Sequence, residues 1–354
     1  MSAMFSVIGW DLGGANLKLA RIEGRRAVAA AQVPCPLRQD ARKFNAALAE
    51  ALPLCPTGAV HAITMTGELS DVFRDRADGV AYLVQMMRQV ADGEAVFYGG
   101  RAGFLRDTGA IAHVHDVASA NWHASASLIG RSHPEALLID AGTTTTDLVA
   151  VKGGAVAAKG YTDGERLAEG ELVYTGVVRT PVMAVARNAP FKGRMQGVAA
   201  ERFATMADVW RLLGSLPAGA DPYPTPDLKG KSTQESAMRL ARMLGRDAGA
   251  SDLLAYVDVA RYVAERQRGE IEAAAAALIT RERLAADAPV IGAGCGRFIA
   301  REIAERLGRD YRDFAEIFDC APQAKDMAAA CAPAVAVGLL AAHELTPDVR
   351  EKLR

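Results

Sequence analysis

The stretch Val7-Ile8-Gly9-Trp10-Asp11-Leu12-Gly13-Gly14-Ala15-Asn16-Leu17-Lys18 decides the fold, because its pattern recurs at Leu137-Leu138-Ile139-Asp140-Ala141-Gly142-Thr143-Thr144-Thr145-Thr146-Asp147. In each copy an apolar run ends in Asp, Gly follows two residues later, and a charged residue stands seven residues after the Asp. A second apolar run then leads to another Gly. Apolar runs that flank a Gly turn predict a β-hairpin. Two copies in the same frame predict a duplicated domain.

The hairpin turns predict anion-binding loops. Glycine has no Cβ, so consecutive backbone N–H groups can form a concave nest around an anion. The first turn contains Gly13, Gly14, Ala15 and Asn16, and Lys18 just beyond it adds a positive charge. We expect this turn to hold phosphate groups.

The second turn consists of Gly142 and the four threonines Thr143, Thr144, Thr145 and Thr146. β-Branched residues resist the positive φ of tight turns, so we interpret the four hydroxyls as phosphate ligands. A Thr-rich strand is the alternative interpretation. We expect the two turns to face a shared cleft between the two halves.

Asp11 and Asp140 stand at equivalent positions at the base of the two turns. Mg²⁺ keeps most of its hydration shell and usually takes one or two carboxylates, which suits this pair. The sequence therefore predicts a magnesium site held by Asp11 and Asp140. The alternative is that each Asp only closes its hairpin.

The chain of 354 residues exceeds the size at which a single hydrophobic core stops growing, so we expect two domains. We place the first at 1–130, completed by a C-terminal helix at 325–354, and the second at 131–324. Strands are expected at 28–33, 60–65, 95–98 and 155–159, and helices at 41–52, 79–90, 118–129, 252–285 and 325–345. The Pro- and Gly-rich stretch 218–233 predicts an irregular loop or lid. Hairpin, strand and helix in duplicate predict an α/β fold with mixed sheets.

Composition narrows the class of protein. The net charge of −1 gives no electrostatic footprint for nucleic acid. Five Cys without C-x-x-C spacing, and no signal peptide before Asp11, indicate a reducing cytoplasm. The apolar stretch 332–342 is shorter than the ~20 residues that a membrane helix needs, so we expect a buried helix there and no membrane partner.

A glycine turn at 289–297 predicts a strand, a turn and a helix whose N-terminus is available to an anion. Its glycines are Gly292, Gly294 and Gly296, and Arg297 stands where a dinucleotide fingerprint needs its last Gly. A Rossmann oxidoreductase is therefore disfavoured. Cys295 within the turn is a reactive thiol or a packing residue, and the absence of a base nearby in sequence favours packing.

Three further groups carry candidate chemistry. Glu68 or Asp71, after the expected strand 60–65, is a candidate general base or second metal contact, and a solvated acid behind a helix cap is the alternative. Arg166 and Arg179 could clamp a carboxylate or phosphate, or could form loop salt bridges. On a strand His113 and His115 would share one face, but no third metal ligand has suitable spacing.

The segment 11–18, the segment 140–147 and the turn 292–296 resemble, in this order, the phosphate 1, phosphate 2 and adenosine motifs of the sugar kinase/Hsp70/actin superfamily. The resemblance spans nearly the whole chain. It implies a two-lobed α/β protein with a duplicated ribonuclease H-like fold and a central cleft.

The segments 66–71, 120–122, 162–167 and 171–181 are similar to the hydantoinase/oxoprolinase-like proteins of the tetrahydromethanopterin-linked one-carbon pathway. This group includes condensing enzymes of methanofuran biosynthesis. The resemblance implies a transferase that joins an aminomethylfuran-methyl diphosphate to the phenol of a tyramine or tyrosine derivative and releases pyrophosphate, in a methanofuran or methylofuran pathway. We therefore expect small-molecule partners, and we leave open whether the protein forms a homodimer.

The resemblance also implies roles for the candidate residues. The diphosphate is held by Gly13, Gly14, Lys18 and Thr143 to Thr146, and Mg²⁺ is bound by Asp11 and Asp140. The phenol proton passes to Glu68 or Asp147. The carboxylate of the acceptor is bound by Arg166 or Arg179. Gly292, Gly294 and Gly296 meet a nucleotide only if ATP binds. The alternatives are an ATP-dependent small-molecule kinase or hydantoinase/oxoprolinase-type hydrolase, and a non-catalytic nucleotide sensor of the actin/Hsp70 type.

Overall fold

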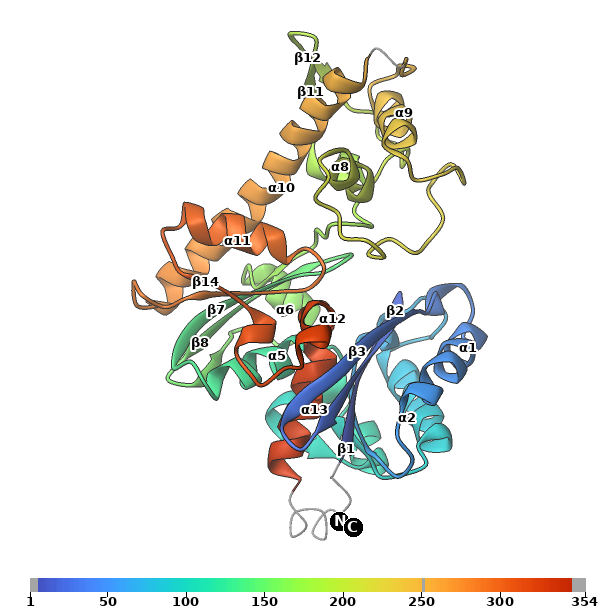
Figure 1. The fold of residues 1–354 in the computed structure, drawn as a ribbon, viewed down its shortest axis with the longest axis vertical. Helices are drawn as coiled ribbons and strands as arrows, with labels where there is room; N and C mark the ends of the chain where they lie inside the picture. Colours follow the sequence, from blue (N-terminus) through green and yellow to red (C-terminus); the bar gives the residue numbers. More distant parts are fainter. Residues whose placement is uncertain (1–5, 250–251, 346–354) are drawn as a thin grey trace. The chain divides into compact units, whose positions relative to one another are not determined.

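The computed structural model describes residues 6–249 and 252–345, and they form two compact units (Figure 1). Unit 1 comprises Met1–Ala136, Val149–Glu165 and Arg312–Arg354, and unit 2 comprises Leu137–Leu148 and Arg166–Tyr311. The C-terminal part of the chain thus joins the first hairpin in unit 1. Residues 346–354 of the expected C-terminal helix lie outside the described residues.

Unit 1 is built on a six-stranded sheet with the order β3-β2-β1-β4-β5-β6. Strand β1 pairs antiparallel with β2 and parallel with β4. The strands of this sheet are β1 (Ser6–Leu12), β2 (Asn16–Glu23), β3 (Arg26–Pro34), β4 (Val60–Met65), β5 (Ala95–Tyr98) and β6 (Phe104–Leu105). Strand β9 (Ala155–Ala157) pairs with β8 (Thr146–Lys152) in the second sheet. The helices are α1 (Arg42–Ala51), α2 (Arg76–Val90), α3 (Asp107–Ala112), α4 (Val114–Val117), α5 (Asn121–Gly130), α12 (Lys325–Ala330) and α13 (Ala332–Glu344). Short 3₁₀ turns occur at Leu37–Gln39, Leu52–Leu54, Gly67–Leu69, Gly100–Ala102, Phe314–Glu316 and Pro322–Ala324.

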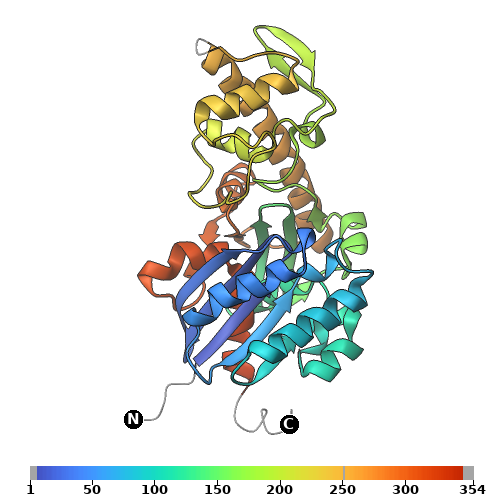
Figure 2. The same ribbon diagram turned by 90° about the vertical axis from the view of Figure 1, so that its right-hand side faces the viewer.

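Strand β1 is buried on both faces, which explains its apolar run. Side chains alternate across a strand, so Ile8, Trp10 and Leu12 share one face and enter the core formed with α1 and α2. On the other face α13 packs directly on the backbone, because a Cβ on Gly9 would lie 1.9 Å from Ala334 O. Figure 2 shows α1 and α2 in front of this sheet.

The expected C-terminal helix is two helices in the structure. Helices α12 and α13 meet at Cys331, whose φ of −107° and ψ of 33° are not helical. Pro333 stands in the first turn of α13, where its missing N–H leaves no helical bond unmade. The expectation of one continuous helix at 325–345 was wrong, but residues Ala332 to Ala341 are buried as expected. No single described helix is long and apolar enough to cross a membrane, and one pair, 322–330 with 332–344, meets that test only when joined across a 111° bend.

Unit 2 repeats the topology of unit 1. Its sheet has the order β10-β8-β7-β13-β14, with β9 also pairing with β8. Its strands are β7 (Glu135–Ala141), β8 (Thr146–Lys152), β10 (Leu172–Val173), β13 (Val290–Ala293) and β14 (Tyr311–Asp313), and α11 (Arg297–Arg306) follows β13. In both sheets the first strand of a hairpin pairs in parallel with a later strand, β1 with β4 and β7 with β13. A further strand pairs with the second strand of each hairpin, β3 with β2 and β10 with β8. The predicted α/β fold with duplicated ribonuclease H-like topology is therefore confirmed.

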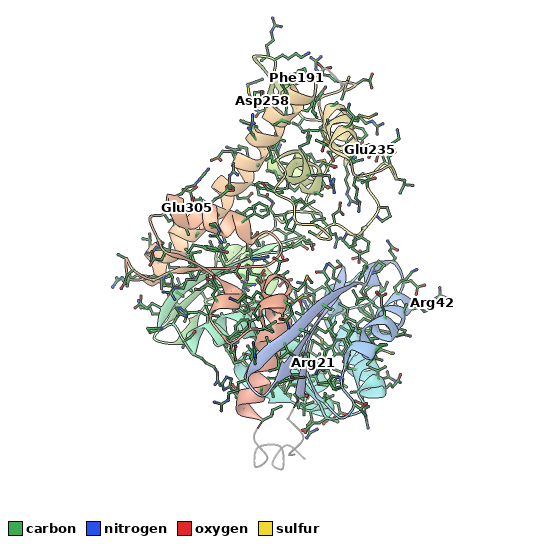
Figure 3. All side chains as sticks on the ribbon, viewed as in Figure 1. Arg21, Arg42, Phe191, Glu235, Asp258 and Glu305 are labelled. Atoms are coloured by element: carbon green, nitrogen blue, oxygen red, sulfur yellow. The ribbon has the colours of Figure 1, made fainter. Side chains whose placement is uncertain are left out.

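An inserted module, residues 182–249, lies between β10 and the long helix α10 (Leu253–Glu282). It contains α7 (Val182–Val185), the hairpin of β11 (Asn188–Phe191) and β12 (Arg194–Gly197), α8 (Met206–Leu212) and α9 (Thr233–Met243), while α6 (Asp163–Ala168) precedes it. Figure 3 labels Phe191 on β11 and Asp258 on α10. The ring of Phe191 contacts Tyr256 of α10 with centroids 5.2 Å apart. Helix α10 thus contacts the module at one end and also contacts β10 and α11 of unit 2.

The stretch between α8 and α9 is irregular, as predicted, and ion pairs hold it. Arg239 of α9 is fully buried and contacts Asp208 of α8 at 2.8 Å and Asp227 of the loop at 3.1 Å. Arg211 contacts Asp221 at 2.7 Å. Because both guanidinium groups have carboxylate partners, this loop is anchored despite its Pro and Gly content.

Candidate functional site

Loop 1, residues 13–16, is the turn between β1 and β2. Its backbone closes through Gly13 N, which donates to Asn16 O at 3.1 Å. Asp11 and Lys18 are direct cross-strand partners, and Lys18 Nζ lies 3.6 Å from Asp11 Oδ2. Asp11 is only 4% exposed. The first predicted acid and cation therefore lie side by side at the base of the loop.

The segment 66–71 lies against loop 1. Thr66 N donates to Leu12 O at 3.0 Å, and a Cβ on Gly67 would lie 2.9 Å from that same oxygen. A Cβ on Gly14 would lie 2.8 Å from Ser70 Oγ. Gly67 is needed because an added Cβ would meet backbone, whereas at Gly14 the added Cβ would meet only the Ser70 side chain. The structure thus brings the segment that carries Glu68 beside the predicted phosphate loop.

Glu68 is a buried carboxyl group in the 3₁₀ turn Gly67–Leu69, with 1% of its surface exposed. Ser119 Oγ donates to Glu68 Oε1 at 3.0 Å, and Glu68 Oε2 has no hydrogen-bond partner among the described residues. Burial raises the pKa of Glu68 to about 7. The alternative of a solvated acid is therefore wrong, and a pKa near neutrality suits general acid–base catalysis.

Ser119 is a residue that the sequence did not single out. Its φ of +55° is in the left-handed region, which a non-Gly residue rarely adopts. The bridge between Met65 and Ala118 fixes this conformation beside the end of β4. A single Ser before a helix carries no local signal for such a contact, because its partner Glu68 is 51 residues away.

Loop 2, residues 142–146, is the equivalent turn in unit 2. Gly142 N donates to Thr145 O at 2.8 Å, which closes the turn. Thr143, Thr144 and Thr145 are partly exposed, whereas Thr146 is the first residue of β8 and is fully buried. Thr146 Oγ1 donates to Thr175 O at 2.8 Å. The Thr-rich strand interpretation therefore holds for Thr146, and three hydroxyl residues remain at the turn.

A bracing segment, residues 175–179, fixes the backbone of loop 2. Val177 N donates to Gly142 O at 3.0 Å, and Arg179 N donates to Thr143 O at 2.8 Å. A Cβ on Gly176 would lie 2.5 Å from Thr143 C and Thr144 N. Loop 2 therefore cannot shift without moving this segment. Arg179, one of the two predicted anion-binding arginines, is attached directly to the loop.

Arg166 and Asp147 are paired with each other. Arg166 is 1% exposed, and its Nη1 donates to Asp147 Oδ1 at 2.5 Å while Nη2 donates to Glu171 O at 2.8 Å. Glu171 is also buried and forms an ion pair with Arg281 of α10. These contacts match the salt-bridge alternative for Arg166 and Asp147. Glu68 lies on the segment against loop 1, and Arg179 is partly exposed and joined to loop 2 by its backbone, so these two residues stay the candidates for the base and the anion-binding cation.

The glycine turn after β13 packs on the base of loop 2. Gly294 has a φ of +81°, and a Cβ there would lie 2.2 Å from Ala141 O and 2.5 Å from Asp140 Oδ1. Gly296 N donates to Ala141 O at 2.8 Å. A Cβ on Gly292 would lie 2.6 Å from the hydroxyl of Tyr311. Close packing thus accounts for all three glycines, whether or not a nucleotide meets this turn.

The donor chemistry of Asp11 and Asp140 fits Mg²⁺. Each carboxylate belongs to the next-to-last residue of the first strand of a hairpin, and Asp140 is 9% exposed. Carboxylate oxygens are the ligands that Mg²⁺ prefers. Within the described ranges no group of three or more His, Cys, Asp or Glu could hold a metal ion. His113 and His115 lie at the junction of α3 and α4 rather than on a strand.

The chain matches known proteins in sequence and fold. The model of the hydantoinase/oxoprolinase family matches residues 59–320. A (4-{4-[2-(gamma-L-glutamylamino)ethyl]phenoxymethyl}furan-2-yl)methanamine synthase from Methanocaldococcus jannaschii is 30% identical over 244 residues, which cover 68% of this chain and 72% of that protein. A synthase of the same name from Methanococcus vannielii is 34% identical over 111 residues, 31% of this chain and 50% of that protein.

A solved structure supports the fold. The nucleotide-free structure of an acetone carboxylase, studied for ATP-dependent acetone carboxylation, has a TM-score of 0.54 over 96% of this chain and 70% of that chain, at 10% identity. At this identity the likeness concerns the fold alone. Since the family model covers most of the chain and the relative from M. jannaschii spans two thirds of it, the protein belongs to the hydantoinase/oxoprolinase family.

Proposed function

We propose that this protein is a transferase that condenses an aminomethylfuran-methyl diphosphate with the phenol of a tyramine or tyrosine derivative and releases pyrophosphate. The reaction would serve methanofuran or methylofuran biosynthesis. The names of the two related synthases support the product class. The observation that carries the proposal is Glu68, a buried carboxyl group with a pKa of about 7 on the segment that lies against loop 1.

The proposed reaction exchanges one C–O bond for another. The bond between the furan methylene carbon and the diphosphate oxygen breaks, and its electron pair leaves with pyrophosphate. The phenol oxygen forms the new bond to that carbon, and its proton passes to Glu68 Oε2. Backbone N–H groups of loops 1 and 2, with Lys18, stabilise the charge that develops on the leaving group.

Asp11 and Asp140 would hold Mg²⁺, which when bound supplies further neutralisation of the leaving diphosphate. In the proposal Thr143, Thr144 and Thr145 donate hydroxyl hydrogen bonds to the same group. Arg179 binds the carboxylate of the phenolic acceptor, because its backbone is attached to loop 2 and its side chain is partly exposed. A planar guanidinium matches a carboxylate through two parallel hydrogen bonds.

The test is a product assay with purified protein, Mg²⁺, the furan diphosphate and γ-glutamyltyramine or tyrosine. The proposal predicts pyrophosphate and a phenoxymethylfuran product in equal amounts, without ATP. Release of ADP from ATP with an acceptor would favour a kinase or an ATP-driven hydrolase instead. Binding of ATP and ADP without turnover would favour a nucleotide sensor, and either result would contradict the condensation.

A further inference from the structure

Gln267 of α10 connects three parts of unit 2 through a fully buried amide. Its Oε1 accepts from Trp210 Nε1 of α8 at 2.8 Å. Its Nε2 donates to Thr175 Oγ1 at 2.7 Å and to Gly176 O at 3.0 Å. The side chain therefore joins the inserted module to the bracing segment through one amide group.

Burial makes these bonds specific. A buried polar group that loses its partner is not compensated by water, so an amide enclosed on all sides is costly to leave unsatisfied. Trp210 is 1% exposed and Thr175 is 3% exposed, so water does not replace the lost partners readily. An apolar side chain of the same size would pack here without directing either neighbour. The amide instead fixes the orientation of Trp210 on one side and of Thr175 and Gly176 on the other.

The bonds continue from the bracing segment to loop 2. Thr175 O accepts from Thr146 Oγ1 at 2.8 Å, and Gly176 touches the peptide between Thr143 and Thr144. Gly176 N also donates to Oγ1 of Thr180, the residue that follows the bracing segment, at 2.9 Å, so this bond further restrains the segment. A displacement of Gln267 would therefore reach the amides of loop 2 through one intervening segment.

We infer that Gln267 is a positioning residue for loop 2 and that it makes the anion affinity of this loop depend on the packing of the inserted module. The inference rests on the proposed function, in which loop 2 binds the diphosphate. It goes further because it gives the inserted module a role. Trp210 of the module fixes the side-chain amide of Gln267, and this amide keeps loop 2 in its anion-binding conformation through the bracing segment.

The experiment compares Gln267→Met, Gln267→Glu and Thr175→Val with the wild type. Gln267→Met removes all three bonds at similar volume, Gln267→Glu keeps the acceptor for Trp210 and loses the donors, and Thr175→Val removes one hydroxyl. Tyr256→Phe is the matched control, because it removes a hydroxyl from the same helix that contacts Asp247 O at 3.5 Å and not the bracing segment. Amide hydrogen exchange across residues 142–146 is measured without ligand, and pyrophosphate with Mg²⁺ is titrated calorimetrically.

We expect faster exchange at 142–146 and about tenfold weaker pyrophosphate binding in both Gln267 variants, a smaller change in Thr175→Val and none in Tyr256→Phe. Folded variants with wild-type exchange at 142–146 would overturn the inference. If amide exchange at 142–146 rises in the Gln267 variants but the wild type does not bind pyrophosphate, the coupling of Gln267 to loop 2 is supported and the proposed function is contradicted. Thr175→Val gives the mildest perturbation, so the test survives if Gln267→Met does not fold.

Discussion

Replacing Glu68 with Gln should abolish most of the activity and at the same time stabilise the protein at alkaline pH. The carboxyl group has a pKa of about 7 in the folded protein against an ordinary value of 4.5. A group whose pKa is raised on folding contributes stability at low pH and loses it as the pH rises through the folded pKa. The difference of about 2.5 units corresponds to roughly 3 kcal/mol.

The wild-type protein should therefore lose about 3 kcal/mol of unfolding free energy from this group between pH 4.5 and 8, and Glu68→Gln should not. At pH 8 the variant should be more stable by up to about 3 kcal/mol, measured by urea unfolding at several pH values. The turnover rate should fall about 10²- to 10⁴-fold, the range for loss of a general base. Glu50→Gln, at an exposed position on α1, is the matched control and should change neither quantity. A Glu68→Gln variant with wild-type turnover, or with the wild-type slope of stability against pH, would refute the reasoning.

Further substitutions at Gly176, Arg166, Arg179 and His61 test other parts of the structure. Gly176→Ala places a Cβ 2.5 Å from the backbone of loop 2, so it should lower the free energy of unfolding by about 1–3 kcal/mol and weaken pyrophosphate binding. The control Gly164→Ala, with no atom within 4 Å of the added Cβ, should change neither quantity. Equal effects of the two substitutions in a calorimetric titration would contradict this role of Gly176. Arg166→Met should lower the free energy of unfolding by about 3 kcal/mol, because it leaves the carboxylate of Asp147, with 15% of its side chain exposed, without its ion-pair partner. Arg179→Met should raise KM for the phenolic acceptor and lower Tm less than Arg166→Met does. The reverse pattern would restore Arg166 as the anion-binding residue. Burial lowers the pKa of His61, so as the pH drops the unfolded chain takes up a proton before the folded protein does. The free energy of unfolding should therefore fall below about pH 6.5, and His61→Gln should flatten this fall in unfolding experiments. An unchanged dependence of stability on pH in the variant would contradict this role of His61.

The local sequence pattern was sufficient to predict the elements that depend on residues close together in the chain. The two hairpins, the strand 60–65 and the long helix α10 follow from apolar periodicity and Gly turns, and all are in the structure. The break at Cys331 was also readable, because Pro333 favours the first turn of a new helix. The apolar residues on both sides of Pro333 favoured the prediction of one continuous helix instead.

Long-range contacts decided the roles that the sequence left open. Composition alone did not indicate that Arg166 is enclosed with Asp147 while Arg179 stays partly exposed, since both lie in the same polar stretch. The distinction arises from the contacts of Arg166 with Asp147 on β8 and with the backbone oxygen of Glu171, the residue directly before β10. Thr146 differs from the threonines before it for a similar reason, because the first residue of β8 faces Thr175. Ser119 and Gln267 were missed because their partners are distant in sequence.

The central part of the proposed function is that loop 1, loop 2, Asp11 and Asp140 all act on one diphosphate. Its most direct test is calorimetric titration of pyrophosphate in Mg²⁺ with Asp11→Asn, Asp140→Asn and the double variant. The account predicts that each single substitution removes most of the Mg²⁺-dependent affinity and that the double variant loses little more, because both residues act on one ligand. Undiminished binding in either folded single variant, or two independent losses that add in full, would contradict it.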